Sequence, residues 1–145
     1  MTTIAYKDGV LAADSATSGD GIVVGHRQKI ERIRGQLVGA AGPIEEAEAF
    51  REWLKKGGRD KDRPEGLEDE FAGIVVERDG RVVEYGKRLV AFGYEAPFYA
   101  IGSGAAIATG AMAAGASAAE AVRIACRFDH YSEEPVHALR LDEGE

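Results

Sequence analysis

Cysteine is almost absent from this sequence: Cys126 is the only one, so no disulfide can form within the chain. We interpret Cys126 as a small buried side chain on a helix, because free cysteine behaves as a weakly polar hydrophobe. No apolar run reaches the length that crosses a membrane, and no signal peptide precedes the first strand pattern. These absences predict a cytoplasmic protein with no membrane partner.

The sequence also has no excess of basic over acidic residues. The chain has 18 Lys and Arg against 25 Asp and Glu, which gives a formal net charge of -7. Without a basic stripe to release counterions, nucleic acid is not expected as a partner. The three histidines, His26, His130 and His137, are too scattered for a metal site, so we expect them at the surface. We therefore predict no metal and no cofactor.

What is present fits one globular domain over residues 1–145, with 45% apolar and 30% charged residues. Short strand patterns separated by turn signals dominate the first forty residues. Asp8-Gly9 and Arg34-Gly35 are turn signals between such runs. Residues 15–21 are rich in Ser, Thr, Gly and Asp, so they are interpreted as a loop. The predicted strands are residues 3–6, 10–13, 22–24, 29–33 and 36–41.

A helical pattern follows residue 42. Pro43 suits the first position of a helix, and apolar residues then recur at helical spacing up to Leu54. Lys55 and Lys56 suit the C-terminal end of the helix, and Gly57-Gly58 ends it. We expect the charged, turn-rich residues 57–70 to form an exposed loop.

The second half returns to strands, continues with two helices and closes with a strand. Ser117 and Glu120 form a capping box for a helix at residues 118–129. The small residues of 103–114 predict a helix packed closely on a flat surface. The predicted strands are 71–76, 81–85, 89–92, 98–101 and 136–141, the first two joined by a turn at Asp79-Gly80. Two sheets with helices outside them would bury these faces, although composition alone equally allows a generic α+β domain.

The most informative residue is Thr2. Removal of Met1 would leave a threonine whose hydroxyl and free α-amine lie on one residue, which is a nucleophile together with its base. Many chains begin Met-Thr, so the signal gains weight only from the residues that follow it in order.

Those residues resemble the proteasome-type N-terminal nucleophile hydrolases, the family of proteasome β subunits and the bacterial peptidase HslV. The stretches that carry the resemblance are TTIAYKDGVLAADSATSG, QKIERI, VGAAG, AIGSGAAIATGAM and RFDHYS. The short Met-Thr start is similar to HslV and to proteasome-like proteins of bacteria and phages. The resemblance implies an α+β fold, a four-layer αββα sandwich, and the activity of a threonine endopeptidase.

The resemblance also implies a role for each matching residue. Thr2 corresponds to the nucleophile, Asp14 and Lys29 to the ion pair beside it, and Gly42 to the glycine whose N–H stabilises the oxyanion. Ser103, Asp129 and Ser132 correspond to groups that support the N-terminus. Thr17 corresponds to a residue that pairs with an extended substrate, and Ala40 lies beside the specificity pocket.

Elementary chemistry agrees with these roles. A lysine ammonium near the threonine hydroxyl favours its anionic form, and a carboxylate keeps that lysine in place. An unperturbed α-amine has a pKa of about 7.7–8.0, so it is available as a base near neutral pH. Each residue also has a structural explanation, as a loop cap, a solvated charge or a helix end. Their agreement with one ordered pattern favours the catalytic interpretation.

The sequence departs from the family pattern at two places. Ser15 meets Ala16 directly where relatives usually have one more residue, which bears on the hydrogen bonds near Lys29. Pro43 replaces a glycine and has no N–H to offer a substrate.

The resemblance further implies a homo-oligomeric ring, stacked on a second ring, that acts on peptides or unfolded proteins. Whether an ATP-dependent unfoldase supplies the substrate stays open. Two other functions also stay open. One is an amidase that acts on a non-peptide amide. The other is a catalytically silent assembly or scaffold subunit, which would follow if Met1 is retained.

Overall fold

A computed structural model describes residues 2–19 and 21–143. These residues form eleven strands, three α-helices and a short 3-10 turn. The strands are β1 (Ile4–Lys7), β2 (Val10–Ala13), β3 (Ala16–Gly19), β4 (Ile22–His26), β5 (Ile30–Ile33), β6 (Gln36–Ala41), β7 (Ala72–Val76), β8 (Val82–Tyr85), β9 (Ala91–Tyr94), β10 (Phe98–Ile101) and β11 (His137–Arg140). The helices are α1 (Ile44–Lys55), α2 (Ala105–Ala113) and α3 (Ala118–Phe128), and the turn is η1 (Asp60–Asp62).

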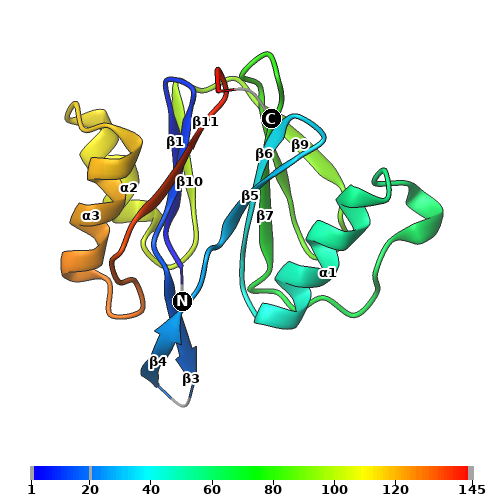
Figure 1. Cartoon of the computed structure of the whole chain (residues 1–145), viewed down its shortest axis with the longest axis horizontal. Helices are drawn as coiled ribbons and strands as arrows, with labels where there is room; N and C mark the ends of the chain where they lie inside the picture. Colours follow the sequence, from blue (N-terminus) through cyan, green and yellow to red (C-terminus); the bar gives the residue numbers. More distant parts are fainter. Residues whose placement is uncertain (1, 20, 144–145) are drawn as a thin grey trace.

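The two large sheets stack face to face between helices. One sheet has the antiparallel order β10-β1-β2-β11, and the other has the order β5-β6-β7-β8-β9. Helix α1 covers the outer face of the second sheet, and α2 and α3 cover the outer face of the first (Figure 1). This is the four-layer αββα sandwich that the sequence predicted.

Three apolar clusters hold these layers together. Between the sheets lie fully buried aliphatic side chains, among them Ile4, Leu11 and Ile74. Under α1 the core is aromatic, with Phe50 fully buried and its ring centroid 5.4 Å from that of Phe71. Under α2 and α3 the core is made mostly of alanine and valine. Small residues let helices approach a sheet closely, as the sequence predicted for residues 103–114, which contain α2.

Most predicted elements are confirmed, and the capping box is seen directly. Ser117 Oγ accepts a hydrogen bond from the N–H of Glu120 at 3.1 Å, and Glu120 Oε1 accepts one from the N–H of Ser117 at 2.9 Å. Helix α1 begins at Ile44, with Pro43 immediately before it. The prediction of a loop over residues 15–21 is wrong in part, because Ala16–Gly19 form β3 and pair with β4. Cross-strand pairing with β4 overrides the low strand propensity of these small residues.

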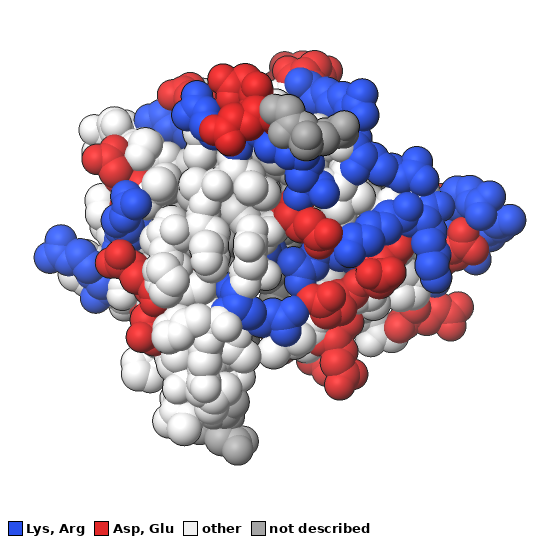
Figure 2. Space-filling model, viewed as in Figure 1, with Lys and Arg blue, Asp and Glu red and all other residues white. Residues whose placement is uncertain are grey.

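The β3–β4 hairpin is a two-stranded sheet of its own that extends from one end of the sandwich, beside the start of the chain (Figure 1). Its outer side chains include Ile22 and Val24, which are 64% and 62% exposed. Uncharged residues cover this part of the face in Figure 2, while acidic and basic residues alternate on the side of α1. In the described part of the chain, no helix has the length and apolar character needed to cross a membrane.

Candidate active site

Thr2 lies at the end of the sandwich from which the hairpin extends, two residues before β1. The ladder pairs Ile4 with Ala13, and the N–H of Asp14 continues it by donating to the carbonyl of Thr3 at 3.1 Å. Strand pairing therefore fixes Asp14 next to the first residues of the chain. Thr2 is 5% exposed and Asp14 is fully buried.

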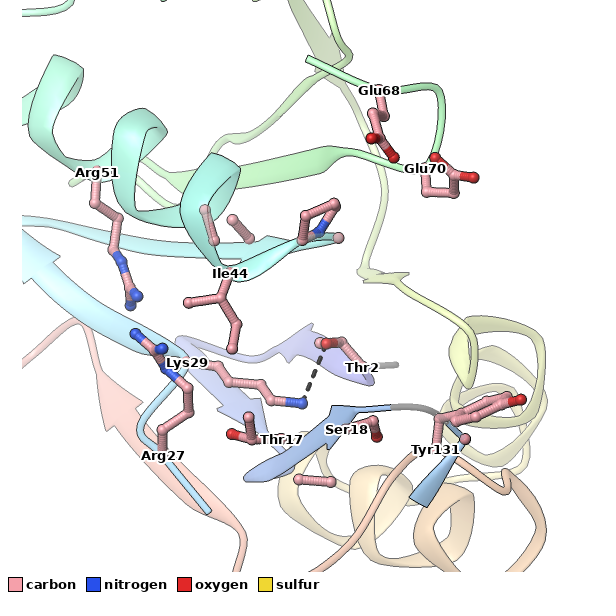
Figure 3. A pocket seen from close by; sticks show the side chains of 16 residues that line it. Thr2, Thr17, Ser18, Arg27, Lys29, Ile44, Arg51, Glu68, Glu70 and Tyr131 are labelled. Carbon is pink, nitrogen blue, oxygen red and sulfur yellow. Dashed lines mark hydrogen bonds between the residues drawn. The ribbon is translucent and has the colours of Figure 1, made fainter. Parts of the chain in front are cut away.

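Lys29 reaches this point from the other sheet, because it directly precedes β5. Its Nζ donates to Thr2 Oγ1 at 3.1 Å and to the two carboxylate oxygens of Asp14 at 3.0 and 3.1 Å. The three side chains that the sequence predicted as nucleophile and ion pair are thus gathered in one hydrogen-bonded unit, of which Figure 3 shows the contact between Lys29 and Thr2. Lys29 is only 8% exposed, so water screens this unit weakly.

Backbone donors hold the Asp14 carboxylate in place. Oδ1 accepts from the N–H of Thr3 at 2.9 Å, and Oδ2 accepts from the N–H groups of Ala16 and Glu133, each at 3.1 Å. The direct junction of Ser15 and Ala16 therefore leaves the pairing with Lys29 intact. It also brings the Ala16 amide onto the carboxylate.

The pKa of Lys29 is lowered from its ordinary value. Burial is the main cause, because removal from water disfavours the ammonium form. The Asp14 carboxylate opposes this effect through its charge and its hydrogen bond, and the nearby Arg27 adds to it. A lysine with a lowered pKa beside a hydroxyl is typical of sites where charge develops on oxygen.

A second group of polar side chains surrounds the backbone of Thr2. The Thr2 N–H donates to Ser103 Oγ at 3.2 Å, and Ser103 Oγ donates to Asp129 Oδ2 at 2.7 Å. Ser132 Oγ donates to the same Asp129 oxygen at 2.5 Å and lies 2.7 Å from Thr3 Oγ1. Ser103 precedes α2, and Asp129 ends α3, so the antiparallel helix pair brings these groups together.

A cleft of about 570 Å³ opens beside Thr2 and contains the other predicted residues. Ala40, Gly42, Thr17 and Lys29 line it (Figure 3). Gly42 has φ +122, and a Cβ there would lie 3.1 Å from the Cα of Phe71, so only glycine fits this turn.

Two hydroxyl groups at the cleft lack partners within the described residues. Thr17 Oγ1 and Ser18 Oγ are buried and make no hydrogen bond there. Buried hydroxyls are normally satisfied, so these two oxygens are exceptions at the edge of the cleft.

Sequence reasoning missed several charged and aromatic residues of the cleft. These are Arg27, Arg51, Glu68, Glu70 and Tyr131. Arg51 could have been found, because it continues the helical spacing of Ile44 and Ala47 on one face of α1. A charged residue at such a position is either exposed or specifically partnered. In the described part of the chain, no group of three or more His, Cys, Asp or Glu side chains could hold a metal ion.

The four-layer αββα sandwich with Thr2 beside a cleft is an architecture that this chain shares with solved structures. The chain is similar to Thiobacillus denitrificans BPH, with a TM-score of 0.67, 21% identity and 99% of each chain covered. It matches the same protein in complex with epoxomicin at 23% identity and TM-score 0.67, covering 98% of this chain and 99% of the other.

The fold is equally similar to that of HslV from Trypanosoma brucei, with a TM-score of 0.67 and 23% identity over 96% of this chain and 98% of the other. No family model matches the sequence, and no curated protein sequence matches it significantly. The resemblance drawn from the sequence is therefore confirmed for the fold. The roles of Thr2 and its neighbours stay predictions, supported by their geometry.

Proposed function

We propose that this protein is a threonine peptidase whose nucleophile is Thr2, exposed by removal of Met1. The observation that carries the proposal is the contact of Lys29 Nζ with Thr2 Oγ1 at 3.1 Å, beside a buried carboxylate and at a cleft. The epoxomicin complex of a protein with the same fold supports it further, since that protein binds a small ligand.

In the proposed reaction, the free α-amine of Thr2 takes the hydroxyl proton while Oγ1 attacks the substrate carbonyl carbon. The positive charge of Lys29 favours the developing oxygen anion of Thr2. The bare N–H of Gly42 stabilises the oxyanion of the tetrahedral intermediate. The ammonium then returns its proton to the leaving amine, and an ester remains on Thr2. Water attacks that ester with the same amine as base, which releases the acid product and restores Thr2.

Ser103, Asp129 and Ser132 act as positioning residues in this proposal. Ser103 accepts from the Thr2 nitrogen, and Asp129 fixes both serine hydroxyls through one oxygen. A carboxylate one hydroxyl away from the amine stabilises the amine after it takes the threonine proton. Thr17 would pair its backbone with an extended substrate, because it lies on β3 at the edge of the cleft.

We further propose that the chain acts as a homo-oligomeric ring, stacked on a second ring. Such closed symmetry keeps an unselective nucleophile away from folded proteins. The exposed apolar side chains of the β3–β4 hairpin are consistent with burial in such an assembly. Light scattering on the native protein measures the assembly directly, and a monomer with full peptidase activity would contradict it.

The function is tested by the intact mass of the native protein together with a covalent probe for N-terminal threonine. We expect a mass without Met1, one probe molecule per chain, and cleavage of unstructured peptides. A protein that retains Met1 and binds no probe would be the silent scaffold subunit instead. Labelling by the probe with cleavage of non-peptide amides alone would identify an amidase.

The lowered pKa of Lys29 predicts an alkaline limit on the rate. The ammonium form favours the Thr2 oxygen anion, so the rate falls as pH rises through a pKa that burial holds below 10.5. The rate also falls as pH drops through the α-amine pKa, about 7.7–8.0 when unperturbed. We therefore expect a bell-shaped profile of kcat/KM, with circular dichroism at each pH to exclude unfolding. A rate that still rises at pH 10.5 would instead make neutral Lys29 the base.

A further inference from the structure

The cleft beside Thr2 has an arginine end that the proposed mechanism does not use. Arg27 lies two residues before Lys29, and Arg51 lies on α1. A terminal nitrogen of each donates to the same oxygen, Oε1 of Glu48. Figure 3 shows the two guanidinium groups pointing toward one another. Two cations thus share one carboxylate oxygen at this end of the cleft.

Arg51 is incompletely satisfied although it is buried. It is 6% exposed, and its Nε makes no hydrogen bond to any described residue. The nearest further acid is Glu31, whose Oε1 lies 3.9 Å from that Nε and whose other oxygen lies 3.1 Å from Lys55. A buried guanidinium nitrogen without an acceptor is unfavourable, so the arrangement indicates that a ligand oxygen completes it.

The arginine end is continuous with the catalytic end. Thr2, Lys29, Ala40, Arg27 and Arg51 all line the one cleft. The small side chain of Ala40 leaves space in the cleft between Thr2 and the two arginines. Lys29 is not available to a substrate carboxylate, because Asp14 binds it through both oxygens.

Opposite charge lies elsewhere in the same cleft. Glu68 and Glu70 also line it, and Figure 3 places them away from the two arginines, beyond Thr2 and Ile44. An elongated substrate with an anionic group would therefore be oriented with that group toward Arg27 and Arg51, since the other orientation places it near two carboxylates.

We propose that the arginine end binds the carboxylate of an aspartate or glutamate side chain in the substrate, on the residue whose carbonyl carbon Thr2 attacks. The proposal rests on the peptidase function above and names its substrate class. Guanidinium groups bind carboxylates through paired N–H donors, and each has five such donors. Glu48, whose side chain is 47% exposed, binds both arginines. When a substrate carboxylate enters, it replaces Glu48 as the acceptor for some of their N–H groups.

The test uses matched fluorogenic peptides that differ only in the residue before the reporter amine: Glu, Gln, Leu and Lys. Glu and Gln are nearly equal in shape, so the ratio of their kcat/KM values reports the charge alone. For the wild-type protein we expect a ratio of about tenfold or more in favour of Glu, as charge-assisted hydrogen bonds in a buried site provide. The Lys peptide is expected to be the poorest substrate.

Three variants locate the effect. Arg27→Gln should bring the Glu to Gln ratio close to one, and Glu48→Gln should raise it, because the competing internal carboxylate is gone. Arg123→Gln, an exposed arginine on α3, is the matched control and should leave the ratio unchanged. Arg51→Gln should act like Arg27→Gln, and if its burial prevents folding the Arg27 and Glu48 variants carry the test.

Covalent labelling of Thr2 separates the possible failures. Suppose that the wild-type protein is labelled and cleaves peptides, but that its kcat/KM values for the Glu and Gln peptides are nearly equal. This result overturns the carboxylate assignment and leaves the peptidase function unaffected. A ratio that stays high in Arg27→Gln also overturns the assignment. If Thr2 is not labelled and no peptide is cleaved, the peptidase function is overturned, and the carboxylate assignment falls with it.

Discussion

Thr2→Ala is expected to abolish peptide cleavage and probe labelling, and Lys29→Ala to lower kcat/KM by at least about 10³-fold. The first substitution removes the attacking oxygen. The second removes the ammonium group that donates to that oxygen at 3.1 Å. Because the two groups act as one unit, the double variant should be little worse than Thr2→Ala alone. Rates of peptide cleavage under single-turnover conditions measure all three.

Controls separate the chemistry from loss of fold. Thr2→Ser keeps a hydroxyl and should keep activity, whereas Lys61→Ala removes an exposed lysine on η1 and should change nothing. Lys29→Ala also leaves the fully buried Asp14 carboxylate without its counter-ion, which destabilises a fold by about 3–5 kcal/mol. Melting temperatures therefore accompany the rates, and assays run well below them. If folded Lys29→Ala keeps most of the wild-type rate, Lys29 is a structural charge.

The parts of the fold that the sequence predicts well are those with strong local signals. The capping box at Ser117 and Glu120, the hairpin turn at Asp8-Gly9 and the helical spacing after Pro43 each depend on nearby residues alone. The residues of the candidate site, in contrast, are predicted by a family resemblance and not by local signals. Nothing local shows that Asp14 and Lys29, which belong to opposite sheets, share hydrogen bonds.

What the sequence did not predict depends on long-range contacts. Residues 16–19 form a strand only because β4 folds back on them. Arg27 and Arg51 meet only because α1 packs over the sheet that β5 begins, which brings both onto Glu48. The proposed preference for an acidic substrate side chain therefore follows from the packing of the layers rather than from any motif.

The second large effect is expected at Gly102, whose backbone touches Thr2 without any side chain. Gly102 has φ +97, a conformation that other residues rarely adopt. A Cβ at this position would lie 2.0 Å from the carbonyl oxygen of Thr2 and 2.7 Å from its carbonyl carbon. Both are backbone atoms, so the neighbour cannot rotate away. Gly102→Ala must therefore shift either the loop before α2 or the nucleophile itself.

We predict that Gly102→Ala lowers kcat/KM by about 100-fold, because a displacement of about 1 Å at a reacting group has effects of that size. The melting temperature should fall too, since the strained backbone conformation costs about 1–3 kcal/mol. Gly110→Ala is the matched control: it lies within α2, and a Cβ there would meet nothing within 4 Å. It should leave the rate unchanged and raise the melting temperature slightly, because alanine favours a helix over glycine by about 1 kcal/mol. The rate of probe labelling, measured where both variants are fully folded, distinguishes a displaced nucleophile from a weakened fold. Equal labelling rates for the two variants would show that the loop, and not Thr2, absorbs the added methyl group.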